Sequence, residues 1–390
     1  MSKLRLLFHP KIVKQIQGLG VLDRKKIRKA LHSLVEYGLD HPSLQIKKLH
    51  GVESIYRLRV GNIRVIIEFD QKQRIIYIRK LGHRRDIYRN LWLYNSSMVI
   101  FDGIKFARQR ELRLRDRIGQ LRKKDLKPVI ASIVFTEDQG SQLYTQKKKA
   151  AANRVGIDFR PIFHSLHDSS SQVLASINRL NHDPAISGVM IQKPAKQVWL
   201  DRVGEGDFTQ WWKSLIGEIE PNKDVDGLTP ITQQAIKDGS WQAKGLVIPA
   251  TAQAILLVLD QAGVTNEVAV AIIGRSDIVG LPIHHALVNL GYKPGLFGRK
   301  DLTNRLNSDQ KLFDFDVVIS ATGVKHLING LQVKQGVVLV DVGEPYPDID
   351  TKSVEQKAKF LSPVPGGVGP VTVVCLLENV VKLLDTKKMI

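Results

Sequence analysis

The sequence predicts an α/β protein in which two α/β parts follow a small α+β domain. Three observations indicate this arrangement. Residues 98–390 alternate helical periodicity with short β-branched apolar runs, as in buried parallel sheets. One of these runs enters a helix through glycines, and the first 97 residues carry an excess of basic side chains that the remainder lacks. A chain of 390 residues is also too long for one ordinary domain.

Charge and composition divide the chain and limit its class. Residues 1–97 have a formal net charge of +14 and residues 98–390 one of +6. A surplus that dense attracts a polyanion such as RNA, DNA or a ribosome surface. The single cysteine, Cys375, lies in an apolar run and is expected to be core filler. One cysteine excludes a disulfide within the chain and a cysteine zinc cluster, and no metal site is predicted. No run is long enough to span a membrane and no signal peptide is present, so we expect a cytoplasmic protein without a membrane partner.

The basic segment begins with an amphipathic helical hairpin. We expect helices at 10–19 and 23–37, with Asp23 as the cap of the second and Gly38 as its end. Three strands are expected at 54–60, 63–70 and 74–80, joined by turns short enough for antiparallel hairpins. These elements make a small α+β domain at 1–90, and 91–97 is expected to be a linker.

Arginines alternate along the first of these strands, so that Arg57 and Arg59 face away from its apolar residues. Arg64 in the next strand is expected to join them, and the segment after the third strand adds Arg84, Arg85 and Tyr88. The strings Tyr-Arg-Leu-Arg-Val, Arg-Val-Ile-Ile and Gly-His-Arg-Arg-Asp-Ile-Tyr resemble the RelE/ParE toxin superfamily over residues 3–90.

That resemblance implies a ribosome-dependent mRNA interferase whose site holds these six residues, with contact to RNA, a ribosome or an antitoxin. Arg57 and Arg59 stand where some members have lysine. Because arginine does not readily lose a proton, these two can stabilise charge but hardly act as a base. A basic fold that binds nucleic acid without cutting it, and gyrase inhibition of the ParE kind, remain alternatives.

Residues 98–390 read as helices alternating with strands. We expect helices at 106–123, 141–155 and 171–180 and strands at 129–135, 158–162 and 188–191. Further buried strands are expected at 268–273, 317–320 and 337–342. The stretch Asp201–Ser214, which contains two adjacent tryptophans, matches no expected element.

The strand at 268–273 enters a helix through glycines. Gly274 permits a tight turn, Ser276 offers a hydroxyl and the helix N-terminus offers unpaired N–H groups, which is typical of a phosphate site. An ordinary strand-to-helix turn is the alternative. Where an acidic residue would favour NAD, the chain has Gly298-Arg299-Lys300, and Arg275 lies in the turn itself. Cations at these places favour NADP.

Four further strings occur in a fixed order along this part of the chain. They are Ser141-Gln-Leu-Tyr-Thr-Gln-Lys-Lys-Lys, Gly188-Val-Met-Ile-Gln-Lys-Pro, Pro221-Asn-Lys-Asp-Val-Asp-Gly and Ser362-Pro-Val-Pro-Gly-Gly-Val-Gly-Pro-Val-Thr. With the Gly-Arg-Ser turn they resemble the bifunctional methylenetetrahydrofolate dehydrogenase/cyclohydrolase family, FolD, over 98–390. The resemblance implies NADP-dependent oxidation of 5,10-methylenetetrahydrofolate to the methenyl form and hydrolysis of that form to 10-formyltetrahydrofolate, by a homodimer.

The implied fold is a folate-binding catalytic α/β domain and a Rossmann-like NADP-binding domain, preceded by the RelE-like α+β domain. The catalytic domain is expected at 98–245, with the C-terminal helix at about 371–390, and the cofactor domain at 246–370. The active site would lie between these two domains.

Tyr144 and Lys148 are four residues apart on one predicted helix, so they share a face. The ring can stack on a flat heterocycle while the amine reaches its reacting carbon, and we expect flanking Lys147 and Lys149 to lower the pKa of Lys148. By resemblance, the catalytic residues are Lys148, Gln192 and Tyr144. The substrate-binding residues are Tyr144, Asp224, Asp226, Pro365, Gly366 and Gly367, and the cofactor-binding residues are Gly274, Arg275, Ser276, Arg299 and Glu344.

Several positions depart from the family pattern. Pro249-Ala-Thr-Ala replaces Pro-Cys-Thr-Pro, Lys193 replaces a customary leucine, and Glu344 stands where an apolar residue normally contacts the cofactor. Most of these changes line the cofactor half, so they bear on cofactor preference and dehydrogenase rate more than on the cyclohydrolase chemistry. The alternative from another class is a nucleic-acid-binding or toxin protein with a vestigial folate portion. Met98 also opens a self-sufficient enzyme sequence, so one hypothesis is that the chain joins two neighbouring genes, by fusion or by a missed stop codon.

Overall fold

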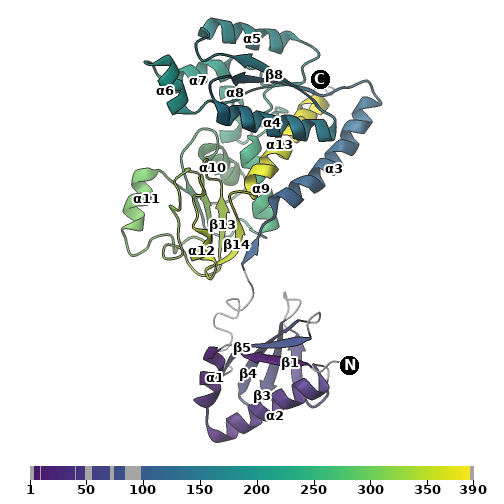
Figure 1. Cartoon of the computed structure of the whole chain (residues 1–390), viewed down its shortest axis with the longest axis vertical. Helices are drawn as coiled ribbons and strands as arrows, with labels where there is room; N and C mark the ends of the chain where they lie inside the picture. Colours follow the sequence, from purple (N-terminus) through teal and green to yellow (C-terminus); the bar gives the residue numbers. More distant parts are fainter. Residues whose placement is uncertain are drawn as a thin grey trace. The chain divides into compact units, whose positions relative to one another are not determined.

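The computed structural model describes residues 4–8, 10–39, 41–48, 55–70, 74–83 and 98–386. The chain separates into two compact units, Met1–Ser97 and Met98–Ile390 (Figure 1). The predicted RNA-site residues Arg84, Arg85 and Tyr88 lie outside the described residues, as does the linker predicted at 91–97. Within the described ranges, no helix is long and apolar enough to cross a membrane.

The N-terminal unit is a five-stranded sheet whose apolar face packs against two helices. The strand order is β1-β5-β4-β3-β2, and β1 is parallel to β5 while the other pairs are antiparallel. Its elements are β1 (Arg5–Phe8), α1 (Pro10–Gln17), α2 (Val21–Tyr37), β2 (Gln45–Lys48), β3 (Ile55–Val60), β4 (Ile63–Asp70) and β5 (Ile75–His83). The expected helical hairpin and three-stranded meander are confirmed. Strands β1 and β2 were not predicted because four residues are too few to show a period.

Helix α2 packs through a stripe with helical spacing, since Ile27, Leu31 and Leu34 are its buried residues. The prediction that Asp23 caps this helix is wrong. The helix begins at Val21, and Asp23 lies in its first turn, where a carboxylate still favours the positive end of the helix dipole. Gly38 ends the helix as expected, with a φ of 85°.

The register places the strand arginines on the sheet face opposite the helices. Arg57 pairs with Lys47 of β2 and Arg59 pairs with Arg64 of β4, so these four side chains share one face. Arg59 is exposed, but Arg64 is only 6% exposed and donates to two backbone carbonyls of the β3–β4 hairpin at 2.8 and 3.0 Å. The prediction that Arg64 shares a face with Arg57 and Arg59 is confirmed. Its guanidinium is buried against the hairpin turn, so it adds little exposed charge to that face.

The second unit contains two sheets. The first has three parallel strands in the order β8-β7-β9. Every residue of β7 is buried, as its β-branched run predicts. Helices α3 and α4 begin earlier than predicted because Asp102 and Asp138 accept hydrogen bonds at their N-caps. The elements are α3 (Gly103–Arg122), β7 (Val129–Phe135), α4 (Gln139–Val155), β8 (Asp158–His164), α5 (Ser170–His182), β9 (Gly188–Ile191), α6 (Lys196–Val203) and α7 (Phe208–Gly217).

The stretch Asp201–Ser214 covers the end of α6, the connecting residues 204–207 and most of α7. These helices bury Trp199, Phe208 and Trp212 in one apolar cluster with residues of the three-stranded sheet. The ring centroids of Trp199 and Phe208 are 5.5 Å apart, within the range of aromatic pairs. The stretch is therefore an aromatic cover of the sheet.

The second sheet has six parallel strands in the order β11-β10-β12-β13-β14-β6. Strand β6 pairs with β14, although the domain prediction placed all of residues 98–245 with the other sheet. A two-residue strand shows no period that a sequence could reveal. The remaining elements are β6 (Val99–Ile100), α8 (Pro230–Lys237), α9 (Ala250–Gln261), β10 (Val270–Ile273), α10 (Gly280–Asn289), β11 (Gly295–Phe297), α11 (Arg299–Leu306), β12 (Val317–Ser320), β13 (Val337–Asp341), α12 (Thr351–Val354), β14 (Ala358–Ser362) and α13 (Val368–Thr386).

Helix α13 packs against α3, α4 and α9, so it contacts elements next to both sheets (Figure 1). Cys375 is fully buried within it, as expected of core filler. An ion pair of 2.9 Å joins Arg110 of α3 to Glu378 of α13, and Arg117 contacts Asp385 at the same distance. This C-terminal helix links the two halves of the second unit.

Candidate active site

Helix α4 brings the predicted catalytic residues together. Lys148 is 5% exposed, whereas its neighbours Lys147 and Lys149 are exposed, because successive residues of a helix point in different directions. The Lys148 Nζ lies 4.9 Å from the centroid of the Tyr144 ring and donates to Gln192 Oε1 at 3.0 Å. Gln192 directly follows β9, so the amine is held between a helix and the end of a buried strand.

Burial controls the ionisation of this group. It lowers the pKa of Lys148, and the Asp226 carboxylate acts in the opposite direction. Burial raises the pKa of Asp226, and Lys148 partly offsets this. Burial, with smaller contributions from Asp226 and Glu344, raises the pKa of Tyr144 to about 12. The expectation that the two flanking lysines lower the pKa of Lys148 is wrong, because the cause is removal of the amine from water.

The two predicted aspartates lie in different surroundings. Asp224 is buried and accepts hydrogen bonds from the backbone N–H groups of Leu228 at 3.2 Å and Thr229 at 2.8 Å. It therefore fixes the loop that leads into α8. Asp226 is the carboxylate that acts on Lys148. Asp224 thus positions the loop, while Asp226 belongs to the charged group around the amine.

Pro365, Gly366 and Gly367 lie in the turn between β14 and α13. Gly366 has a φ of 98°, and its carbonyl accepts a hydrogen bond of 2.8 Å from the N–H of Gly103. A Cβ on Gly103 would overlap the carbonyl oxygen of Gly367. Glycines are required here because the turn packs backbone to backbone against the start of α3.

The loop after β10 has the form of a phosphate-binding turn. Gly274 has a φ of 110°, and a Cβ there would overlap the carbonyl oxygen of Ala321. Ser276 Oγ accepts from the N–H groups of Val279 and Gly280, at 3.2 and 3.4 Å, where α10 begins. The first turn of α10 holds no acidic residue. Gly274, the Ser276 hydroxyl and a first helical turn without a carboxylate fit the phosphates of a dinucleotide. Asp277, in the turn that precedes the helix, is the acidic residue nearest to it in the sequence.

The two predicted cofactor arginines have different contacts. Arg275 forms an ion pair of 2.8 Å with Asp301 and donates to the carbonyl of Leu296 at 3.2 Å. Arg299 is exposed at the first residue of α11. Glu344 is exposed in the loop after β13. Both arginines are exposed, but Arg275 ties the turn to the neighbouring strand, whereas Arg299 makes no ion pair among those of the described residues.

Comparisons with known proteins extend these observations. Family models for the tetrahydrofolate dehydrogenase/cyclohydrolase catalytic domain and NAD(P)-binding domain match residues 101–226 and 249–388. The bifunctional protein FolD of Lactobacillus helveticus is 36% identical over 293 residues, which cover 73% of this chain and 96% of that protein. The chain belongs to the FolD family.

Solved FolD structures share the fold of the second unit. The Campylobacter jejuni enzyme covers 74% of this chain and 99% of its own, with 28% identity and a TM-score of 0.64. The Trypanosoma brucei enzyme, solved with NADP and an inhibitor, covers 76% and 100%, with 25% identity and a TM-score of 0.67. A RelE–RelB complex from Methanococcus jannaschii is 32% identical and covers 22% of this chain and 96% of its own, with a TM-score of 0.20. The toxin interpretation of residues 1–90 stays a prediction.

One residue that the motif pattern did not assign to the FolD site, Asp138, holds the site together. Asp138 accepts from the N–H and hydroxyl of Ser141, at 3.1 and 2.8 Å, and from the N–H of Ala195 at 2.7 Å. Burial alone would raise the pKa of Asp138, but these hydrogen bonds hold it below its ordinary value. Asp138 thus clamps the helix that carries Lys148 to the loop that carries Gln192. The spacing of an aspartate three residues before a serine is the signal that could have indicated it.

We expect Asp138→Ala to lower the free energy of unfolding by about 1–3 kcal/mol, because it removes an N-cap and leaves buried N–H groups unpaired. Urea unfolding followed by tryptophan fluorescence measures this loss. Asp102→Ala, which removes the exposed cap of α3, is the matched control and is expected to cost less. Equal losses in the two variants would contradict the clamp.

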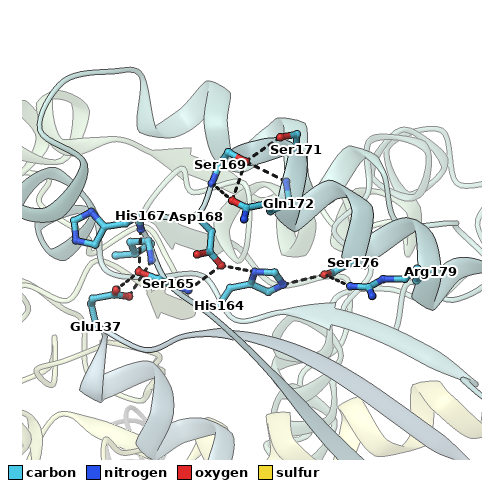
Figure 2. A network of polar contacts seen from close by, with 11 residues as sticks. Glu137, His164, Ser165, His167, Asp168, Ser169, Ser171, Gln172, Ser176 and Arg179 are labelled. Carbon is cyan, nitrogen blue, oxygen red and sulfur yellow. Dashed lines mark hydrogen bonds and ion pairs between the residues drawn. The ribbon is translucent and has the colours of Figure 1, made fainter.

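A second polar network holds the loop between β8 and α5 (Figure 2). His164 contacts Asp168 at 2.7 Å and Ser176 at 3.0 Å, and Arg179 also donates to the Ser176 hydroxyl at 3.0 Å. Glu137, which precedes α4, accepts from two groups of this loop at 2.5 and 2.9 Å. Asp168, His164 and Ser176 are linked in the order of the acid, base and nucleophile of a hydrolase triad. Ser176 is only 4% exposed within α5, so a substrate cannot reach its hydroxyl. The network therefore supports the start of α4 and presents no nucleophile.

Proposed function

We propose that the second unit oxidises 5,10-methylenetetrahydrofolate to the methenyl form and hydrolyses that form to 10-formyltetrahydrofolate. The observation that supports this most is the buried amine of Lys148, bound to Gln192 beside the ring of Tyr144. When bound, NADP accepts the hydride that leaves the one-carbon bridge. The chain's own residues bind the pterin and move the protons.

For the hydrolysis, we assign each group a role from its surroundings. Tyr144 offers an apolar ring face for the pterin, and Asp226 accepts hydrogen bonds from pterin N–H groups. Burial increases the neutral fraction of Lys148, which takes a proton from water as the oxygen attacks the cationic methenyl carbon. One carbon–nitrogen bond then breaks and its nitrogen keeps the electron pair, so water and the methenyl cation give the formyl product and one proton.

The direct test supplies the purified full chain with each substrate in turn. With 5,10-methylenetetrahydrofolate and NADP we expect NADPH to form, and with the methenyl compound we expect 10-formyltetrahydrofolate. A folded protein that performs neither reaction would refute the proposal. That outcome would favour the alternative of a nucleic-acid-binding or toxin protein with a vestigial folate portion.

We propose NADP as the cofactor, held by residues 246–370, while residues 98–245 and α13 hold the folate. Gly274, Ser276 and the start of α10 would hold the phosphates. Exposed Arg299 suits the 2′-phosphate, and Arg275 supports the turn. Glu344 would lie between the cofactor and Tyr144, whose pKa it raises. The turn at 365–367 would border the folate.

We propose that the second unit forms a homodimer, as its family resemblance implies. Four apolar side chains in β6 and α3 are more than half exposed, namely Val99, Ile100, Ile104 and Leu112. Apolar side chains gathered along neighbouring elements suit a contact between two copies. Sedimentation of the purified chain measures its oligomeric state.

We propose for the N-terminal unit that its basic sheet face binds RNA. The observation that favours this is the register that places Lys47, Arg57 and Arg59 on one face. Cations spaced along neighbouring strands can contact successive phosphates. A more specific role of the same surface would be cleavage of ribosome-bound mRNA or contact with an antitoxin.

We expect the affinity of the full chain for a single-stranded RNA oligonucleotide to fall steeply with salt. Loss of two phosphate contacts in Lys47→Ala/Arg59→Ala should reduce the slope of log affinity against log salt by about 1.4. Lys25→Ala/Lys29→Ala, on the exposed side of α2, is the control. Equal slopes in all three proteins would contradict the assigned face.

A separate experiment tests the nuclease role of the N-terminal unit. Loss of mRNA cleavage in Tyr88→Phe would support that role, and unchanged cleavage would refute it.

A further inference from the structure

The side chain of Lys193 joins the two halves of the second unit. Lys193 stands where the family pattern has leucine, and it directly follows Gln192 at the end of β9. Its Nζ lies 3.8 Å from Oδ1 of Asp277. Asp277 directly follows Ser276 in the turn after β10. The ion pair therefore connects the catalytic loop of one sheet to the phosphate-binding turn of the other.

The helices of the aromatic cover hold Lys193 in place. Its Nζ lies 5.3 Å from the ring centroid of Trp212 and 5.6 Å from that of Phe208, both within cation–π range. The backbone carbonyl of Lys193 accepts from the Ser141 hydroxyl at 3.2 Å. The lysine side chain is 27% exposed, so its position is fixed by these contacts more than a free surface lysine would be.

The negative charge of Asp277 is unfavourable for phosphate binding at the turn in which it lies. Asp277 lies two residues before Val279, the N-cap of α10, and its carboxylate would repel phosphates bound at this turn. The nearby Arg275 is already paired with Asp301 and the carbonyl of Leu296. Lys193 is the cation that pairs with Asp277 among the ion pairs of the described residues.

We infer that Lys193 determines cofactor affinity in this chain by neutralising Asp277 at the phosphate-binding turn. This inference rests on the proposed dehydrogenase function. The hydrolysis of the methenyl compound uses no dinucleotide, so Lys193 acts on the binding of NADP more than on the cyclohydrolase reaction. In this account the aromatic side chains of α7 hold the lysine that replaces leucine, and that lysine neutralises Asp277.

The test measures binding of NADP to the full-length protein by titration calorimetry. Lys193→Met keeps the length of the side chain and removes its charge, and we expect the Kd for NADP to rise about fivefold. Asp277→Asn alone should not weaken binding. The double variant Lys193→Met/Asp277→Asn should return to within about twofold of the wild-type Kd, because neither charge remains.

Lys213→Met is the matched control, since Lys213 is an exposed lysine of α7, and it should change the Kd less than Lys193→Met does. The rate of methenyl hydrolysis is the second readout, and its loss in Lys193→Met should be smaller than the loss of NADP affinity. An unchanged Kd in Lys193→Met, or a double variant as weak as the single one, would overturn the charge role. Wild-type protein that binds no NADP would overturn this inference and the proposed dehydrogenase together, whereas tight binding in every variant would overturn this inference alone.

Discussion

Replacing Lys148 by methionine is expected to reduce the cyclohydrolase rate of the full chain at least about 100-fold, the usual contribution of a positioned acid–base group. Methionine fits the buried space beside Tyr144 and Gln192 but cannot accept or donate a proton. Conversion of methenyltetrahydrofolate by the purified variant, compared with wild type at one pH, measures the loss. Dehydrogenase turnover should also fall, because in the proposed site the same amine would lie beside the one-carbon bridge in both reactions.

Two controls on the same helix separate this role from a general effect of charge. Lys147→Met and Lys149→Met remove exposed amines next to Lys148 in the chain. Both should retain activity within about twofold, since exposed charges are screened by water. Losses in these controls as large as in Lys148→Met would mean that the helix face, and not the one buried amine, carries the effect.

Asp226→Asn is expected to reduce kcat/KM about 10- to 100-fold, because it removes the charged group that we propose as hydrogen-bond acceptor for the pterin. It should also move the pH profile. The Asp226 carboxylate raises the pKa of Lys148, so its removal lowers that pKa further. If the neutral amine is the base, the rate rises as pH rises through the pKa of Lys148, and in the variant this rise begins at lower pH.

The measurement is kcat/KM for the methenyl compound over a range of pH. Asp224→Asn is the control, because Asp224 accepts from backbone N–H groups and should affect stability more than the profile. A rise that stays at the same pH in Asp226→Asn, or moves to higher pH, would contradict the electrostatic coupling of Asp226 to Lys148.

The pairing of Tyr144 with Lys148 was predictable from their spacing, because a helix brings residues four apart to one side. The cause of the lowered pKa of Lys148 was not, because a run of three lysines does not show which one is buried. Burial depends on how α4 packs, which involves residues distant in the sequence. The same reason explains Arg64, whose strand face was predictable but whose burial was not.

The shortest strands, and the side-chain contacts that join segments distant in the sequence, could not be predicted from the sequence pattern either. Strands β1, β2 and β6 have two to four residues, so only their pairing with longer strands defines them. Asp138 reads as an ordinary helix cap, and its bond to Ala195 becomes visible only when α4 and the loop after β9 lie together. Lys193 was recognisable as unusual, but its partner Asp277 is 84 positions later in the sequence.

The most direct test of this account is the titration of the Lys148 amine itself, followed by NMR of the full chain with isotopically labelled lysine side chains. We expect one lysine signal to titrate at lower pH than the signals of exposed lysines and to be absent from the spectrum of Lys148→Met. If the signal that disappears in Lys148→Met titrates together with those of exposed lysines, the amine is not the buried base described above.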